Sequence, residues 1–344
     1  MSKMNVAMYY NNSDVRIEQM PIPSIGDDEI LVKVIACGIC GSDVMEWYRI
    51  KKAPLVLGHE LAGVVEKIGK NVKKFEVGDR VFVTHHVPCN TCRYCLKGED
   101  TVCHTLHSTT FYPGGFAQYL RVPAINVDRG TIKLPDEMSF DEATFIEPLG
   151  CVVRGFRNAR FKPTRSVLIL GCGMAGLLHI KLAKALGASR IFATDVDGDR
   201  LKMAKKLGAD FVFHASEDVK QKIRENNDGC LADFVGLCAG VPSAVSQALE
   251  CVEDGGSILW FAPTKPGESV SFPFFEVWNK QIYMCSTYAA AGKDLVEAIE
   301  LIRSKRVMVE DMITHKLPLS EAQKGFSLAA KASDSMKVII EPNK

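Results

Sequence analysis

The most constraining stretch of this 344-residue chain is a glycine-rich run that directly follows a short apolar segment. Residues 166–170 read S-V-L-I-L, residues 171–176 read G-C-G-M-A-G, and a helical pattern follows. In a strand–turn–helix unit the first glycine, Gly171, permits a tight turn, and Gly173 lets the backbone approach a pyrophosphate. Gly176 allows close packing of the helix on the strand. The run therefore predicts a dinucleotide-binding unit.

The cofactor is indicated by an acidic residue at the end of the next predicted strand. That strand reads R-I-F-A-T-D and ends at Asp195. A carboxylate at this place hydrogen-bonds the ribose hydroxyls and repels a 2′-phosphate, which favours NAD over NADP. Met174 and Ala175 open the helix whose N-terminus faces the phosphates. Arg200 is a positive charge near this site and leaves room for tolerance of NADP. The alternative interpretation of the whole run is that its glycines serve only a tight turn in another kind of α/β domain.

The pattern of apolar residues changes twice along the chain and predicts two domains of an α/β protein. Residues 1–154 contain β-branched segments separated by glycine turns, which indicate strands. Residues 155–288 alternate apolar strands with helical patterns, which is typical of a doubly wound parallel sheet. Residues 289–344 contain an amphipathic helix, a helix capped by Ser320 and a final strand, M-K-V-I-I-E-P. We assign this last segment to the first domain.

Composition excludes several classes of function. The chain has 47% hydrophobic and 24% charged residues, as in globular proteins, and a formal net charge of +1. This charge favours neither nucleic acid nor an anionic membrane as a partner. The N-terminal residues contain no apolar signal region, and no apolar run reaches the roughly 18 residues needed to cross a bilayer. We therefore expect a cytoplasmic protein.

Four of the twelve cysteines form a closely spaced cluster, C-x2-C-x2-C-x7-C, at Cys89, Cys92, Cys95 and Cys103. Four soft thiolates suit a closed tetrahedral zinc site with a structural role. An iron–sulfur cluster is an alternative, but the last gap is seven residues rather than three and no proline follows Cys103. Free thiols and a nucleic-acid zinc finger are further alternatives, and the pI near 7.5 disfavours the zinc finger.

A second set of possible metal ligands lies between residues 40 and 60. Cys40 begins this stretch, and the triplet G-H-E at its end contains His59 and Glu60. A thiol, an imidazole and a carboxylate form a mixed donor set, which suits a catalytic zinc that keeps one coordination position open. Taken singly, Cys40 is most typical of a buried core residue and His59 of a hydrogen-bonded core or turn residue, and Glu60 is typical of a surface charge.

Short motifs occur along the whole chain in the order of one known family. They read G-I-C-G-S-D, G-H-E, V-G-D-R-V, the four-cysteine cluster, P-G-G-F-A-Q-Y, E-P-L and G-C-G-M-A-G. In these motifs the chain resembles the medium-chain, zinc-containing alcohol and polyol dehydrogenases, close to the sorbitol and threonine dehydrogenase branch. The resemblance implies a Rossmann coenzyme domain at residues 155–288 and a mostly β, GroES-like catalytic domain at residues 1–154 and 289–344.

The resemblance also implies the ligands of the catalytic zinc. These are Cys40, His59 and Glu60, with Glu147 of E-P-L as a fourth ligand or as the partner of the bound water. Which of the two glutamates binds the zinc directly at any moment stays open. Relatives of the liver type have a cysteine in place of Glu147, so the carboxylate indicates the polyol branch.

Two further roles follow from the resemblance. Asp43 would orient the ring of His59, and Ser42 would pass the substrate proton outward. The histidine that often continues this relay is replaced by Met45. Possible substitutes are Glu46, His85, His86 and the ribose of the cofactor.

A basic run lies close to these residues. Arg49, Lys51 and Lys52 could meet a phosphate or carboxylate, but a solvated loop is the preferred interpretation.

The predicted enzyme is an NAD-dependent oxidoreductase with two zinc ions per chain, one catalytic and one structural. It would transfer a hydride between NAD and a small secondary alcohol, polyol or sugar-like, to give the ketone, in a cleft between the domains. A homodimer or homotetramer is expected from the family. Alternatives are a dehydrogenase of sugar phosphates or hydroxy-amino acids, a zinc-free reductase of activated alkenes or quinones, and a non-catalytic dinucleotide-binding protein.

Overall fold

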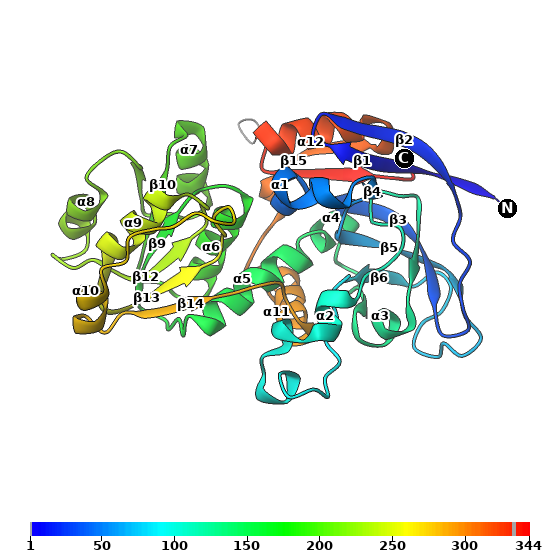
Figure 1. Ribbon diagram of the computed structural model, residues 1–344, viewed down its shortest axis with the longest axis horizontal. Coiled ribbons are helices and arrows are strands. Elements are labelled where there is room, and N and C mark those ends of the chain that lie inside the picture. The colour runs from blue at the N-terminus through cyan, green and yellow to red at the C-terminus, as the bar shows by residue number, and fades with distance from the viewer. Residues whose placement is uncertain (1, 332–334) are drawn as a thin grey trace. The chain divides into compact units, whose positions relative to one another are not determined.

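A computed structural model describes residues 2–331 and 335–344 (Figure 1). The chain divides into two compact units, Met1–Gly150 with Ala289–Lys344, and Cys151–Tyr288. The first boundary falls inside helix α5 (Ile146–Asn158), which runs from one unit into the other. Because this helix is continuous, no turn or change of composition marks the boundary in the sequence.

The second unit contains a six-stranded sheet in the order β11-β10-β9-β12-β13-β14, and every neighbouring pair is parallel. The strand order reverses at β9, so the sheet has the two halves of a doubly wound fold, as predicted. Its strands are β9 (Ser166–Leu170), β10 (Arg190–Asp195), β11 (Phe211–His214), β12 (Ala232–Leu237), β13 (Val252–Trp260) and β14 (Tyr283–Ser286). Its helices are α6 (Met174–Ala185), α7 (Gly198–Leu207), α8 (Val219–Asn226), α9 (Pro242–Cys251) and α10 (Phe274–Asn279).

All five residues of β9 are buried, as expected for a central strand that is covered on both faces. The apolar core of the unit includes Leu168, Val235 and Ile258 from three adjacent strands. Phe192 and Phe211 stack across β10 and β11 with ring centroids 5.3 Å apart. Gly171 directly follows the last residue of β9, so the glycine turn begins where a fully buried strand ends.

The first unit is mostly β. Its larger sheet follows the path β15-β16-β3-β5-β6-β8, with β7 paired to β3, and a three-stranded sheet has the order β2-β1-β4. The strands are β1 (Lys3–Asn11), β2 (Asp14–Pro21), β3 (Ile30–Gly38), β4 (Leu55–Val56), β5 (Glu60–Ile68), β6 (Arg80–Val83), β7 (Tyr119–Val122), β8 (Thr131–Lys133), β15 (Ile313–Pro318) and β16 (Lys337–Glu341). The α-helices besides α5 are α1 (Glu46–Arg49), α2 (His104–Ser108), α3 (Ala124–Arg129), α4 (Phe140–Ala143), α11 (Gly292–Arg303) and α12 (Ala322–Lys331). Short 3₁₀ turns are η1 (Gly41–Asp43), η2 (Ile50–Lys52), η3 (Cys95–Lys97), η4 (Asp100–Val102), η5 (Glu310–Met312) and η6 (Leu319–Glu321).

The C-terminal segment differs from the prediction in two details. Strand β15 was missed because it has no continuous apolar run and its residues alternate between exposed and partly buried positions. Ser320 lies inside η6, whose N-cap is Pro318, so its predicted role as a helix cap is wrong. The predicted final strand is confirmed as β16, which pairs parallel with β15.

The first and last segments of the chain pack together in the first unit. In Figure 1 the red helix α12 lies beside the blue strands β1 and β2. The side chain of Gln323 accepts a hydrogen bond from the Val15 backbone N–H at 2.6 Å, and the rings of Tyr9 and Phe326 lie 5.6 Å apart. Strand β16 then pairs antiparallel with the end of β3, where Ile339 lies opposite Gly38. The C-terminal strand thereby reaches the segment that contains Cys40.

No helix in the described ranges is both long enough and apolar enough to span a membrane.

Candidate functional site

Strand pairing brings Cys40 together with His59 and Glu60. Cys40 follows the end of β3, and Glu60 is the first residue of β5. The two strands pair antiparallel with Gly38 opposite Glu60, so the end of one meets the start of the other. The potential ligand atoms of the three residues lie within 4.8 Å of one another. A gap of nearly twenty residues in the sequence is thus closed by the register of the sheet.

A buried carboxylate fixes the orientation of the His59 ring. The Asp43 side chain is fully buried, and its Oδ1 lies 3.3 Å from His59 Nδ1. Its Oδ2 accepts a hydrogen bond from the Cys40 backbone N–H at 3.1 Å. Since Nδ1 faces Asp43, Nε2 is the ring nitrogen left for a metal. Burial opposes the charge of Asp43, but His59 and Arg49 outweigh this effect and hold the pKa of the carboxyl below its usual range.

The charges around His59 and Cys40 are those of a site that needs a cation. Burial lowers the pKa of His59, but the nearby Asp43 and Cys40 outweigh it and raise this pKa well above its usual value. Burial and the Glu60 carboxylate raise the pKa of the Cys40 thiol. A thiolate is thus disfavoured when only protein groups surround it. A divalent cation would balance the negative charge of Cys40 and Glu60 together.

Glu60 is held by a residue that the sequence did not reveal. Both Glu60 and Lys337 are completely buried, and the Lys337 ammonium forms an ion pair with Glu60 Oε2. The same ammonium lies 4.9 Å from the centroid of the Phe145 ring. Lys337 is the first residue of β16 and lies 277 positions from Glu60 in the chain. A single lysine before an apolar strand is a weak signal, because most such lysines are solvated.

The donor set fits a zinc ion with an open position. The second oxygen of Glu60, Oε1, is buried and has no hydrogen-bond partner within the described part of the chain. A buried carboxylate oxygen without a partner is unfavourable, and a cation among the three ligand atoms accounts for it. Glu147 lies in the first turn of α5 and is buried, but it is outside the group of close ligand atoms. Its role at the zinc stays a prediction.

Arg49 lies against the residue expected to pass the proton. Its guanidinium donates to the Ser42 carbonyl oxygen at 2.9 Å and to Ser42 Oγ at 3.0 Å. It also lies 3.5 Å from Asp43 Oδ1. The preferred interpretation of a solvated basic loop is therefore wrong for Arg49, whereas Lys51 and Lys52 are exposed. Sequence reasoning missed this contact because it depends on how α1 folds back over η1.

Glu46, His85 and His86, the residues that could take the place of the relay histidine replaced by Met45, differ in their surroundings. Glu46 Oε2 accepts a hydrogen bond from the Asn12 backbone N–H at 3.1 Å, so this carboxylate is engaged by the β1–β2 turn. The centroid of the His85 ring lies 4.9 Å from that of His59 and 3.7 Å from that of His86. The three histidine rings therefore form one cluster beside Cys40 and Glu60.

Both histidines are neutral at neutral pH. Burial, then the neighbouring His86 and His59, hold the pKa of His85 well below its usual value. Burial also lowers the pKa of His86, to about 4.

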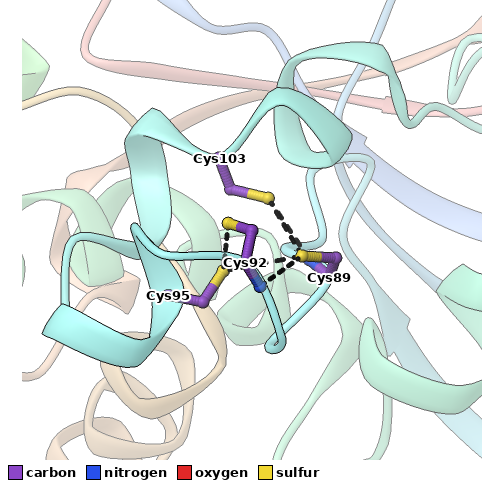
Figure 2. A group of neighbouring side chains, drawn as sticks. All are labelled: Cys89, Cys92, Cys95 and Cys103. Atoms are coloured by element: carbon purple, nitrogen blue, oxygen red, sulfur yellow. Dashed lines mark hydrogen bonds between the residues drawn. The ribbon is translucent and has the colours of Figure 1, made fainter.

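The four cysteines form a compact lobe whose sulfur atoms converge (Figure 2). The Sγ–Sγ distances are 3.6 Å for Cys92–Cys95, 3.6 Å for Cys103–Cys89 and 4.0 Å for Cys89–Cys95. A tetrahedron with zinc–sulfur bonds of about 2.3 Å requires sulfur atoms roughly 3.8 Å apart. The four residues therefore fit a closed zinc site.

Local hydrogen bonds support a thiolate at Cys89 in this lobe. The Cys92 backbone N–H donates to Cys89 Sγ at 3.2 Å, and the Thr91 hydroxyl donates to the same sulfur at 3.5 Å. The Thr91 hydroxyl, followed by the N–H groups of Thr91 and Cys92, lowers the pKa of Cys89 to about 5. These donors all come from within three residues of the sulfur they contact.

The glycine turn in the second unit has the geometry expected for a dinucleotide site. Gly171 has φ +97°, where other residues are strained, and a Cβ on Gly176 would collide with the Gly171 carbonyl. A Cβ on Gly173 would meet nothing within 4 Å, so the backbone there is open to a ligand. Gly173 also caps α6 without a side-chain bond. The α6 N-terminus, with Met174 and Ala175, is thus available to a phosphate.

Asp195 is joined to the same turn. Its Oδ2 accepts a hydrogen bond from the Cys172 N–H at 2.7 Å, and its Oδ1 accepts one from the Asp197 N–H at 3.0 Å. Each oxygen keeps one lone pair for a further donor, such as a ribose hydroxyl. Arg200 lies 3.8 Å from Asp195 Oδ2 and partly balances its charge.

Comparisons with known proteins agree with this combination of fold and sites. Residues 26–136 match the family model of the alcohol dehydrogenase GroES-like domain, and residues 175–304 match that of zinc-binding dehydrogenases. The sorbitol dehydrogenase of Bacillus subtilis is 31% identical, over 99% of this chain and 98% of the relative. The L-threonine 3-dehydrogenase of Bacillus velezensis is 36% identical, over 95% of each chain. The crystal structure of galactitol-1-phosphate dehydrogenase from Escherichia coli has a TM-score of 0.87 and 26% identity, over 98% of this chain and 100% of that one.

A Rossmann domain, a GroES-like domain and two groups of residues able to hold a metal ion are the features of a zinc-binding, dinucleotide-dependent dehydrogenase. The chain belongs to the medium-chain family of zinc-containing alcohol and polyol dehydrogenases, with zinc and a nicotinamide dinucleotide as its cofactors. The predicted family, fold class and enzyme class are confirmed. The roles of single residues are not decided by these matches.

Proposed function

We propose that this enzyme oxidises a secondary alcohol group of a polyol or sugar-like substrate to a ketone, with NAD as the hydride acceptor. The proposal is carried by the convergence of the ligand atoms of Cys40, His59 and Glu60, together with the buried Glu60 Oε1, which has no hydrogen-bond partner within the described residues. Sorbitol dehydrogenase, one of the similar proteins, is named for a polyol. Glu147 in place of a cysteine supports the same branch of the family.

The proposed ligands of the catalytic zinc are Cys40 Sγ, His59 Nε2 and Glu60 Oε1, with Glu147 as a fourth ligand or as the partner of the bound water. The four-cysteine lobe would hold the structural zinc, which gives two zinc ions per chain. We assign the catalytic domain to residues 1–154 with 289–344 and the NAD-binding domain to residues 155–288. The glycine turn and Asp195 belong to the latter.

The protein groups around the ligands have distinct proposed tasks. When bound, zinc lowers the pKa of the substrate hydroxyl and the nicotinamide accepts the hydride. Asp43 keeps the His59 ring in one orientation. Ser42 Oγ accepts the substrate proton on the lone pair that Arg49 leaves free, and it donates its own proton onward. Met45 cannot receive that proton, so a histidine ring or the ribose of the cofactor is required.

The NAD preference is supported by the position of Asp195. Its carboxylate is buried and fixed at the glycine turn, where a 2′-phosphate would meet its negative charge. Arg200 weakens this repulsion, so measurable activity with NADP is compatible with the proposal.

One experiment tests the substrate class. Purified enzyme is assayed with polyols, simple alcohols, sugar phosphates and hydroxy-amino acids, each with NAD and NADP, and reduced nicotinamide is followed by absorbance. The expected result is the highest kcat/KM for a polyol with NAD. A higher kcat/KM for a sugar phosphate would contradict the polyol assignment, and inactivity with every alcohol would support a non-catalytic dinucleotide-binding protein.

A hydroxy-amino acid such as threonine is the second candidate substrate. It is favoured by the 36% identity with L-threonine 3-dehydrogenase, a higher value than that for the sorbitol dehydrogenase. The same panel separates the two candidates, because a threonine-type enzyme would reach its highest kcat/KM with the amino acid.

We further propose that the enzyme is a homo-oligomer, with the edge of β14 as the contact surface. This strand is at one end of its sheet, and α10 nearby exposes Phe274 by 72% and Trp278 by 66%. Phe272 and Phe275 are exposed as well. A free strand edge beside exposed aromatic residues suits pairing with the same edge of a second copy across a two-fold axis. Light scattering should give a multiple of 37.9 kDa, and Trp278→Ser should shift the mass towards the monomer.

A cytoplasmic location is supported by the cysteines. All twelve are free thiols in the structure, and eight of them lie outside the four-cysteine lobe. Thiols that hold zinc persist in a reducing compartment. Fractionation of source cells should place the enzyme in the cytoplasmic fraction.

A further inference from the structure

The buried ion pair of Lys337 with Glu60 has a consequence for the metal site. An ammonium and a carboxylate with no exposed surface lose their hydration, and only their mutual contact and nearby polar or aromatic groups replace it. The Phe145 ring faces the ammonium on one side. The pair is therefore a fixed part of the interior rather than a mobile surface contact.

Gly38 leaves room for this ion pair because it has no side chain. A Cβ on Gly38 would lie 2.5 Å from Lys337 Nζ and 2.6 Å from Glu60 Oε2. Gly38 is the last residue of β3 and lies opposite both Glu60 of β5 and Ile339 of β16. The three strands therefore enclose the pair two residues before Cys40.

The two oxygens of Glu60 have different surroundings. Oε2 contacts the Lys337 ammonium, and Oε1 has no hydrogen-bond partner within the described residues. Glu60 is also one of the three residues whose ligand atoms converge. A carboxylate between two cations divides its negative charge between them. Each cation therefore weakens the attraction between the carboxylate and the other cation. Without the ammonium, both oxygens of Glu60 would be available to one metal ion.

We propose that Lys337 is a positioning residue that keeps Glu60 a weak, displaceable ligand of the catalytic zinc. By holding Oε2, Lys337 limits Glu60 to contact through Oε1 and preserves a coordination position for the substrate. This inference rests on the proposed function, because it takes Cys40, His59 and Glu60 as the zinc site. A purely structural lysine would only neutralise a buried carboxylate and support the fold.

The test measures metal binding as well as activity. Full-length Lys337→Met is compared with wild type for the rate at which zinc passes to a coloured chelator. The same proteins, loaded with cobalt in place of the catalytic zinc, are compared by visible absorption, which reports the ligand number. Because Glu60 becomes a full-time ligand, we expect zinc release to slow by about 10-fold or more, with a changed cobalt spectrum and reduced kcat.

Three further variants serve as controls. Lys337→Arg keeps the positive charge and should restore release close to the wild-type rate. Lys316→Met removes a lysine from the adjacent strand β15, where it pairs with Asp141 at the surface, and should leave release unchanged. In a Glu60→Gln background the effect of Lys337→Met should vanish, because Lys337 acts through that carboxylate.

The outcomes separate this inference from the proposed function. Zinc release from Lys337→Met that is unchanged or faster, in a protein with the wild-type melting temperature, overturns the inference alone. If Lys337→Met does not fold, Lys337→Gln, which keeps a hydrogen-bond donor beside Glu60, replaces it with the same criteria. If Cys40→Ser contains as much zinc as wild type, the zinc site itself is wrong and the proposed function fails with it.

Discussion

The two groups of residues that could hold a metal ion are built in opposite ways. The four-cysteine lobe spans residues 89–103, and its turns and hydrogen-bond donors come from the same short segment. The Cys40 group joins the ends of two paired strands, and a third strand from the C-terminus supplies Lys337. The four-cysteine lobe is thus formed by one short segment, whereas the Cys40 group is formed by the pairing of strands in the sheet.

The groups that surround the possible ligands also differ in charge between the four-cysteine lobe and the Cys40 group. In the lobe, a neutral N–H group and a hydroxyl group donate to the Cys89 sulfur atom. Around the Cys40 group, charged side chains are involved instead, with Asp43 against His59 and Arg49 on one side and Glu60 against Lys337 on the other. Such balanced pairs allow the metal environment to be tuned without changing a ligand.

The largest effect is expected for Cys40→Ser. Loss of the thiolate should remove the catalytic zinc and lower kcat/KM by about 1000-fold or more, which corresponds to about 4 kcal/mol of transition-state stabilisation. Zinc content should fall from two ions to one per chain, and NAD affinity measured by nucleotide titration should stay unchanged. Full activity in the variant, or loss of both zinc ions, would contradict the separation of the two sites.

A large effect on stability rather than catalysis is expected for Cys103→Ser. This cysteine is buried in the lobe, so its loss should release the structural zinc and leave the other ligands uncompensated. The melting temperature measured by calorimetry should fall by roughly 5–10 °C. Folded protein at low temperature should keep kcat/KM within about 10-fold of wild type. If both kcat/KM and the catalytic zinc are lost, the two sites are not independent.

An intermediate effect is expected for Asp43→Asn. The amide keeps the shape but removes the charge that faces His59 Nδ1, so zinc affinity or kcat/KM should fall by about 10- to 100-fold. Competition with a chelator measures the affinity. Asp141→Asn, at a partly exposed pair with Lys316, is the matched control and should change zinc affinity by less than about twofold. An equal fall in zinc affinity in both variants would show that Asp43 has no special role.

The smallest effect is expected for Thr91→Val in the lobe. It removes a hydroxyl that donates to Cys89 Sγ at 3.5 Å, a contact worth about 1 kcal/mol or less. The melting temperature should fall by about 1–4 °C, and both zinc ions should be retained. Loss of the structural zinc from this variant would show that one neutral donor matters as much as a ligand.

The sequence predicts features that depend on neighbouring residues. The glycine turn after β9, the buried parallel strands and the four-cysteine cluster all have their signals within short segments. Lys337 and Arg49 have none, because their roles arise only when β16 pairs with β3 and when α1 folds back over η1. Strand β15 was missed since half-exposed strands lack a continuous apolar run.

Strand β16 also sets the order in which the two metal sites can be completed during synthesis. A growing chain has every ligand of the four-cysteine lobe once residue 103 has been added, and domains fold as their residues emerge. Cys40, His59 and Glu60 are present equally early, but β16 brings Lys337 beside Glu60 only after residue 337 has been added. On the ribosome the four-cysteine lobe can therefore form first, and the Cys40 group acquires its final charge balance only after residue 337 has been added.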